Sequence, residues 1–196
     1  MTGELLQEVY DRITEECFAL FDEGKKMTVD EVIIDLMSLD GVVMHSPYHH
    51  YIMPAALLVC AAMDKQPSRE EFHKQLQAAE GRGKTVPGGA CGNCGACGSG
   101  VGIGIFISIF TGATPMAADS WKLANEGTAR GLMGLAEYPG PRCCKRTAFL
   151  ALKSAVPYIN EKCGLDIGLN KEITCGFYDR NAECLGLNCP FYKEMN

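Results

Sequence analysis

The chain has 196 residues, a length typical of one domain of ordinary size. Apolar residues make up 47% of it and charged residues 21%, with both signs mixed, a composition that excludes intrinsic disorder and is enough to fill one core. The formal net charge of −6 gives no support for nucleic acid as a partner. The polar, acidic N-terminus lacks the features of a secretory signal, so we expect a cytoplasmic protein with reduced thiols.

Amphipathic helices are expected over the first two-fifths of the chain. Across residues 3–23, apolar side chains recur at spacings of three and four. A second helix is expected to begin after Thr28, a suitable N-cap. Residues 44–54 are expected to interrupt the helical pattern, and residues 55–63 to form a short apolar helix.

A polar helix is expected next, from Ser68 to about Gly81, because Ser68 and Glu71 have the spacing of a capping box. The composition then changes, and residues 85–118 carry no charged side chain. Their most apolar part, residues 101–110, is too short for a membrane span, which needs about 20 residues. We therefore predict a buried helix and no membrane partner.

This buried helix is expected to pack closely against another element. Gly100, Gly104 and Ser108 recur every four residues, which leaves one helix face nearly smooth. The lost helix propensity of two glycines implies that the contact matters. Such a face would serve a homodimer as well as a core.

Two more helices are predicted, over residues 117–137 and from Pro141 toward Ile159, with Pro157 bending or ending the second. From Gly164 onward there is little periodicity, which indicates an irregular, cysteine-held tail.

The predicted fold is all-α, a single mainly helical domain with a Gly/Cys-rich loop and an irregular cysteine-rich C-terminal tail. One domain is expected over residues 1–196, with N-terminal helices in 1–38 and a cysteine-rich core in 40–193.

Cysteine is the informative residue, since the chain has 11. Their odd number and the chain length disfavour a disulfide scaffold. Eight of them fall into three groups: Cys91, Cys94 and Cys97; Cys143 and Cys144; and Cys175, Cys184 and Cys189. The other three, Cys17, Cys60 and Cys163, are expected to pack as small hydrophobic residues.

Each group has a feature that favours metal binding. The first is a C-x2-C-x2-C run within glycines, the spacing with which ferredoxin-type loops aim several sulfurs at one iron–sulfur cluster. The third ends in Cys189-Pro190, a familiar end of cluster-binding runs. These spacings predict an iron–sulfur cluster, most simply of the four-iron type.

The adjacent pair Cys143 and Cys144 lies at an expected helix start, flanked by Arg142, Lys145 and Arg146. The helix dipole and these cations are expected to favour thiolates, with one cysteine as ligand and the other structural or reactive. The loop, this helix start and the tail would then converge on one cluster. The favoured ligands are Cys97, Cys144, Cys184 and Cys189, with the other four grouped cysteines as alternates or redox partners.

Other interpretations stay open. The grouped thiols could hold a structural zinc ion or form a metal-free dithiol pair. The glycines from Gly98 to Gly104 invite a nucleotide-binding interpretation, but no strand precedes them. His45, His49 and His50 could supply an acid–base group or a ligand, or lie in a surface loop.

Four sequence blocks carry a family resemblance: HSPYHHYIMPAALLV, GGACGNCGACGSGVGIGIFISIFTGATP, GPRCCKRTAFLAL and CGFYDRNAECLGLNCPFY. Over residues 40–193 the chain resembles an uncharacterised cysteine-rich prokaryotic family, a domain of unknown function found in anaerobes and methanogens, alone or joined to methyltransferase-like or radical-SAM modules. That family has cysteine at the positions of Cys91 and Cys97 but often an aromatic residue at that of Cys94. The resemblance implies shared cysteine chemistry and does not support Cys94 as a shared ligand.

The cysteine set is also similar in kind to that of non-redox desulfidases, in which three cysteines hold a four-iron cluster and the fourth iron stays open to sulfur. We therefore expect sulfur or thiol chemistry on a small thiol-containing substrate, as a lyase or sulfur transferase, with Lys145, Arg142 and a histidine supplying charge and protons. The alternatives are a redox or electron-transfer module that serves a partner protein through a fully ligated cluster, and a structural zinc protein.

Overall fold

The computed structural model describes residues 3–193, with side chains from Leu6 onward. This part of the chain forms eight α-helices, two short 3-10 helices and no strand. The helices are α1 (Gly3–Glu23), α2 (Val29–Ser38), α3 (His49–Lys65), α4 (Arg69–Lys84), α5 (Ala90–Asn93), α6 (Gly98–Phe110), α7 (Asp119–Ala136), α8 (Cys144–Cys163), η1 (Tyr178–Arg180) and η2 (Gly186–Asn188). The all-α prediction is confirmed, and no helix within residues 3–193 is long and apolar enough to cross a membrane.

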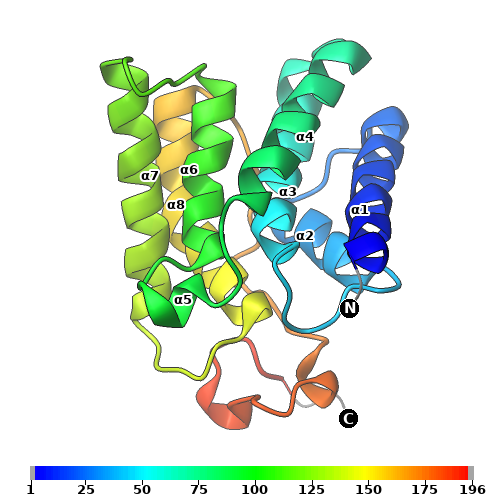
Figure 1. Ribbon diagram of the computed structural model, residues 1–196, viewed down its shortest axis with the longest axis vertical. Helices are drawn as coiled ribbons and strands as arrows, with labels where there is room; N and C mark the ends of the chain where they lie inside the picture. The colour runs from blue at the N-terminus through cyan, green and yellow to red at the C-terminus, as the bar shows by residue number, and fades with distance from the viewer. Residues whose placement is uncertain (1–2, 194–196) are drawn as a thin grey trace.

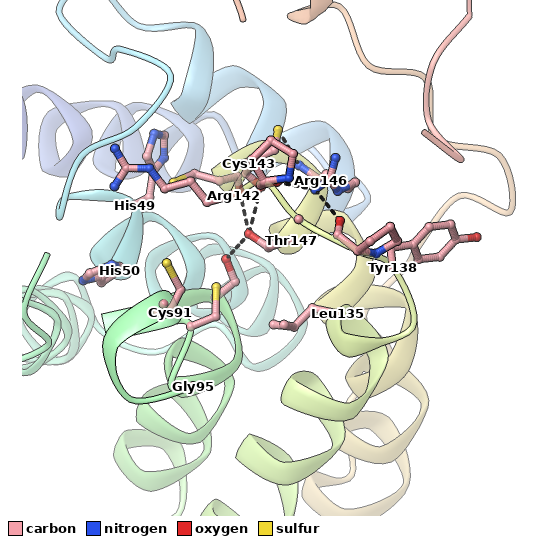
Figure 2. Close-up of a pocket in the computed structure, with 18 residues that line it drawn as sticks. His49, His50, Cys91, Gly95, Leu135, Tyr138, Arg142, Cys143, Arg146 and Thr147 are labelled. Atoms are coloured by element: carbon pink, nitrogen blue, oxygen red, sulfur yellow. Dashed lines mark hydrogen bonds between the residues drawn. The ribbon is translucent and has the colours of Figure 1, made fainter. Parts of the chain in front are cut away.

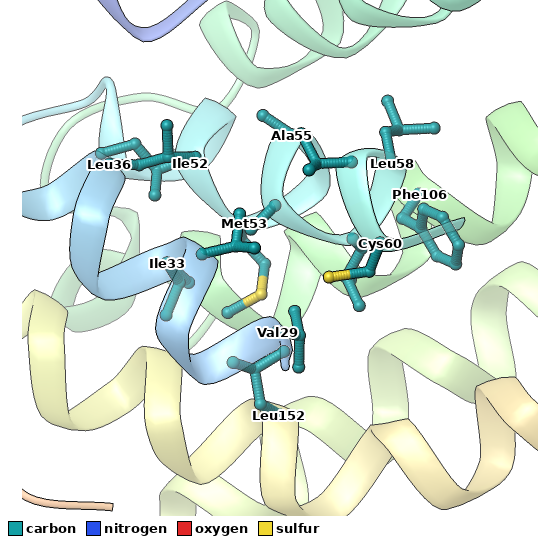
Figure 3. Close-up of a cluster of buried hydrophobic side chains, with 14 of the residues drawn as sticks. Val29, Ile33, Leu36, Ile52, Met53, Ala55, Leu58, Cys60, Phe106 and Leu152 are labelled. Atoms are coloured by element: carbon teal, nitrogen blue, oxygen red, sulfur yellow. The ribbon is translucent and has the colours of Figure 1, made fainter. Parts of the chain in front are cut away.

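The helices form two groups joined at α3. On one side α6, α7 and α8 lie side by side, and on the other α1, α2 and α4 surround α3 (Figure 1). Helix α3 also packs against α6, so that one continuous core runs through both groups. Figure 3 shows the centre of that core, where Met53 and Cys60 of α3 face Val29 and Leu152 of the neighbouring helices. The short α5 and the tail lie at the end of the molecule where α8 begins.

The predicted starts of α1, α2 and α4 are confirmed. Helix α1 covers the predicted residues 3–23. At α2 the side chain of Glu31 accepts a hydrogen bond from the Thr28 backbone N–H at 2.8 Å. At α4 the hydroxyl of Ser68 accepts a hydrogen bond from the Glu71 backbone N–H at 3.1 Å. Both caps use N–H groups that the first helical turn leaves unpaired.

The predicted start of the third helix is wrong, because α3 begins at His49 rather than after Pro54. Helix α8 continues through Pro157 to Cys163, so Pro157 does not end it. A proline inside a helix removes one backbone hydrogen bond. In α3 that loss is offset by burial, because the preceding Tyr51, Ile52 and Met53 are at most 1% exposed.

The smooth face of α6 packs against α7, which confirms the predicted close contact. A Cβ atom built on Gly100 would lie 2.6 Å from Cδ2 of Leu132, and one on Gly104 would lie 2.9 Å from the carbonyl oxygen of Ala124. Helix α7 thus covers this face at Gly100 and Gly104 within the same chain. Helix α7 in turn packs closely on α8 at Gly134.

Replacing Gly104 by alanine tests this packing. We expect Gly104→Ala to lower the free energy of unfolding by about 1–3 kcal/mol, since the new methyl group would collide with the α7 backbone. As the matched control, Gly81→Ala in α4 meets nothing within 4 Å and is expected to raise that free energy by about 0.5–1 kcal/mol through helix propensity. Urea unfolding of both variants measures the difference, and equal stabilities would contradict the close α6–α7 contact.

Candidate functional site

A cavity of about 300 Å³ lies where α6 and α8 begin. Its walls come from the first turns of α3, α5, α6 and α8 and from the segment after α7. In Figure 2, His50 and Cys91 lie on one side of it and Leu135 and Tyr138 on the other. The sulfur-bearing residues of its wall are Cys91, Cys97, Cys143 and Cys144. We call this space the thiol cavity.

Three of these cysteines come from three different helix starts. Cys91 lies in α5, Cys97 is the N-cap residue of α6, and Cys144 is the first residue of α8. Burial raises the pKa of the Cys144 thiol to about 12, and the nearby Cys97 thiol adds to the rise. The prediction that neighbouring cations favour a Cys144 thiolate is therefore wrong for the metal-free chain, because desolvation outweighs the lowering of the pKa by Lys145.

Cys94, the middle cysteine of the C-x2-C-x2-C run, stands apart. Its side chain is exposed, lines neither this cavity nor the tail cavity described next, and donates a hydrogen bond to the Ala90 carbonyl at 3.2 Å. The structure thus separates Cys94 from Cys91 and Cys97, the two positions that the family resemblance favours.

The tail cysteines surround a second, smaller cavity of about 10 Å³. Its wall contains Cys143, Cys175, Cys184 and Cys189, and we call this set the tail thiol group. Seven of the eight grouped cysteines therefore lie at two adjoining cavities, and Cys143 lines both of them. Of the four favoured ligands, Cys97 and Cys144 lie at the thiol cavity and Cys184 and Cys189 in the tail thiol group.

Sulfur atoms of the tail thiol group accept hydrogen bonds from N–H donors. The Cys143 sulfur accepts from the Arg146 backbone N–H at 3.5 Å and from the Asn181 side-chain amide at 3.6 Å. The Cys184 sulfur accepts from the Gly186 backbone N–H at 3.4 Å. Donors aimed at sulfur stabilise a thiolate or a metal-bound sulfur.

Asn181 is the residue that sequence reasoning missed. It is 7% exposed although it lies in an irregular, polar tail. Nothing in its local sequence separates it from a surface asparagine, and only the folded tail brings its amide to a sulfur.

For Cys175, burial raises the thiol pKa, and a backbone hydrogen bond from Phe177 opposes that rise.

Two cations lie buried beside these thiols. Lys145 is 0% exposed, and its Nζ lies 3.2 Å from the Val43 carbonyl and 3.2 Å from His49 Nε2. Arg146 is 4% exposed and donates to the carbonyls of Pro139 and Pro141 at 3.1 and 2.6 Å. Neither cation forms an ion pair with a carboxylate of the described chain. A buried charge without a counter-ion is costly, and an anion bound in this region would offset that cost.

The charge on the wall of the thiol cavity comes from two arginines, Arg142 and Arg146. No aspartate or glutamate lines it, and the first turns of α6 and α8 contain no acidic residue. The N-terminal ends of both helices, each with a partial positive charge, face this region. Arg142 adds an exposed guanidinium at the rim.

Of the three histidines singled out in the sequence, His49 and His50 lie at the thiol cavity and His45 does not. Nδ1 of His50 lies 3.0 Å from the Val86 carbonyl, so it carries the proton and leaves the Nε2 lone pair available. That edge of the ring adjoins the start of α6, because a Cβ built on Gly98 would lie 2.6 Å from Nε2. Burial and the adjacent Lys145 hold the pKa of His49 well below its usual range. His45 instead lies 3.3 Å from Glu183 of the tail.

No three His, Cys, Asp or Glu side chains of residues 3–193 are arranged to hold a single metal ion. The remaining cysteines behave as expected: Cys17 and Cys60 are buried in the core, and Cys163 packs against it. The glycines from Gly98 to Gly104 belong to α6, which no strand precedes in the described chain, so the context of a nucleotide-binding loop is missing.

The chain belongs to a family of unknown function, DUF5714, whose model matches residues 17–192. No curated protein and no solved structure matches the chain significantly. The match includes both sets of thiols and both buried cations.

Lys145 makes the stability of the metal-free chain depend on pH. Burial lowers its pKa from 10.5 to about 8, so the unfolded chain binds the proton more tightly than the folded chain. This penalty is full below pH 8 and disappears as the pH rises to about 10.5. We therefore expect Lys145→Met to stabilise the metal-free protein at pH 7 by roughly 2–3 kcal/mol, and the gain to shrink toward pH 10.5.

Denaturant unfolding of the metal-free protein between pH 7 and 10.5 measures the difference between Lys145→Met and the unmodified chain. Lys153→Met, at an exposed lysine of the same helix, is the control and is expected to stay within about 0.5 kcal/mol. A variant that is less stable than the unmodified chain at pH 7 would show that Lys145 has a counter-ion.

Proposed function

We propose that the protein binds an iron–sulfur cluster of the four-iron type in the thiol cavity and uses it in sulfur or thiol chemistry. Cys91, Cys97 and Cys144 are the proposed ligands. The proposed reaction is desulfuration of a small thiol-bearing substrate.

The observation that carries this proposal is the pair of buried cations without carboxylate partners, next to a thiol-lined cavity without acidic residues. Lys145 and Arg146 need a negative charge nearby, and the described chain offers only sulfur. A cluster with thiolate ligands is anionic and would supply that charge where the two cations lie.

The arrangement of the thiols favours a cluster over a zinc ion. Zinc requires four donors at about 2.3 Å from one point. The described side chains form no such group, and the thiol cavity is large. In a cluster each thiolate binds a separate iron, so its ligands surround a wider core and need not meet at one point.

Three thiol ligands would leave one iron of the cluster without a protein ligand. An open iron is typical of a reaction centre, whereas a redox centre has a protein ligand on every iron. A cluster with one open iron would supply a Lewis acid for the sulfur of a substrate. His50, with its Nε2 lone pair, would take a proton from the carbon next to the one that carries sulfur. The carbon–sulfur electron pair then leaves with sulfur, and the products are an alkene and hydrogen sulfide. Arg142 at the rim would pair with a carboxylate of the substrate.

Removing single thiols tests the cluster. After anaerobic reconstitution with iron and sulfide, we expect about four irons and four sulfides per chain in the thiol cavity, with absorbance near 400 nm. Cys97→Ala and Cys144→Ala are expected to lose this cluster, because each removes a thiol of the cavity wall. Iron, acid-labile sulfide and the visible spectrum are measured for each variant.

Cys94→Ala is the matched control, since Cys94 belongs to the same cysteine run but its thiol is exposed and lines neither cavity. It is expected to keep the full iron content. Protein without iron and sulfide, or with one zinc ion in their place, would refute the proposal.

The sulfur chemistry has its own test. Hydrogen sulfide release from cysteine and from 3-mercaptopropionate is measured with the loaded protein. We expect His50→Gln to keep its iron and to lower the rate about 100-fold or more, the usual contribution of a general base. A loaded protein that releases no sulfide from either compound, or a His50→Gln variant with an unchanged rate, would contradict the proposed reaction.

A further inference from the structure

His50, the proton acceptor of the proposed reaction, is held by contacts from outside its own helix. Its Nδ1 donates a hydrogen bond to the Val86 carbonyl at 3.0 Å, in the segment after α4. A Cβ atom built on Gly83 of α4 would lie 3.2 Å from the carbonyl carbon of His50, so α4 packs closely on its backbone. The ring itself faces Gly98, the first residue of α6. The position of the imidazole therefore depends on elements other than α3.

The ring of His50 occupies the space that a side chain of residue 98 would need. A Cβ atom built on Gly98 would lie 1.9 Å from Cδ2 of His50, 2.5 Å from Cγ and 2.6 Å from Nε2. Carbon atoms that are not bonded to each other pack at about 3.5–4.0 Å. Even one methyl group at position 98 therefore requires the ring to move.

Backbone conformation does not explain the glycine at position 98. Gly98 is helical and is not one of the glycines with positive φ, the backbone region that other residues avoid. Alanine would also have the higher helix propensity at this position. What glycine provides here is room for the imidazole.

The surroundings of His50 also decide which of its nitrogens carries the lone pair. Because a carbonyl oxygen only accepts, Nδ1 carries the proton and Nε2 the lone pair. Nε2 has no hydrogen-bond partner among residues 3–193, and unlike Nδ1 of His49 it is not closed off from water-sized molecules. A ring displaced by a side chain at position 98 would lose the bond to Val86 and, with it, the fixed tautomer.

We propose that Gly98 is a positioning residue for His50: because it has no side chain, the imidazole keeps its bond to Val86 and presents the Nε2 lone pair at the thiol cavity. The inference rests on the proposed function for the role of His50 as the base, whereas the contact itself needs no cluster. Two consecutive residues at the start of α6 would then have different tasks. Cys97 is a proposed ligand, and Gly98 sets the place of the proton acceptor.

The tautomer is measured first, on the metal-free full chain labelled with nitrogen-15 histidine. Long-range proton–nitrogen correlation spectra distinguish a protonated Nδ1 from a protonated Nε2, and His50→Gln identifies the signals of His50. We expect the Nδ1–H form in the unmodified protein and loss of that form in Gly98→Ala. Gly92→Ala is the matched control and is expected to keep the form, because Gly92 lines the same cavity and a Cβ there meets nothing within 4 Å. An unchanged tautomer in Gly98→Ala would overturn the inference.

Urea unfolding tests the contact without catalysis and still decides if Gly98→Ala alone does not fold. We expect Gly98→Ala to lower the urea midpoint of the unmodified chain, because the new methyl group meets the ring. In the His50→Ala background the ring is absent, so the same substitution is expected to leave the midpoint unchanged or to raise it. An equal loss in both backgrounds would show that Gly98 does not act through His50.

Sulfide release by the loaded protein tests the role in the reaction. We expect Gly98→Ala to keep its iron and sulfide and to lower the rate about 10-fold or more. Added to His50→Gln it is expected to cause no further loss, since both changes act on one base. Gly81→Ala, whose methyl group meets nothing within 4 Å, is expected to keep the full rate. A Gly98→Ala variant with an unchanged rate, or one that loses iron as Cys97→Ala does, would refute the positioning role.

The outcomes separate this inference from the proposed function. If the tautomer and the urea midpoint respond as expected but His50→Gln keeps its rate, the proposed reaction fails while Gly98 still positions the imidazole. If His50→Gln is slow and Gly98→Ala keeps the Nδ1–H form, the positioning role fails and the proposed function stands.

Discussion

The buried positive charge at the start of α8 is the constraint on which the site depends. Lys145 and Arg146 are almost fully removed from water and have only carbonyls, an imidazole and an aromatic ring around them. Neutral partners satisfy hydrogen bonds but do not balance charge. The neighbouring groups that can become anionic are thiols, on both sides of the two cations. The fold therefore carries an electrostatic cost in its metal-free form that an anionic centre would remove.

The glycine contacts among α6, α7 and α8 place this charge beside the thiols. Gly100 and Gly104 let α6 approach α7, and Gly134 lets α7 approach α8. Helices α6, α7 and α8 pack on one another, and α6 and α8 begin at the same end of the molecule, so that both helix N-termini face one cavity. The glycines lower the helix propensity of α6 and α7. Larger residues at these positions would push the helices apart and so disturb the site.

Much of this architecture could be predicted from the sequence. Apolar spacing, the caps at Thr28 and Ser68 and the four-residue glycine repeat are local signals, and the structure agrees with them. The helical course of residues 49–54 could not be predicted, because burial of side chains by distant elements outweighs the local cost of Pro54. The cysteines were recognisable as a chemical set, but their division between two cavities depends on tertiary packing that spacing does not encode. The burial of Lys145 could not be predicted either, because it also depends on tertiary packing.

The adjacent cysteines lie where the two cavities meet, since Cys143 lines both of them and Cys144 lines only the thiol cavity. Cys143 is the N-cap of α8 with extended backbone angles, φ −146° and ψ 107°, whereas Cys144 is already helical. The change of conformation directs the Cys143 sulfur toward Asn181 and leaves Cys144 beside Cys97. Cys143 therefore both caps α8, by accepting from the Arg146 N–H, and lines the tail cavity. Its loss would weaken the helix start and the tail together, so a variant at Cys143 does not separate metal binding from folding.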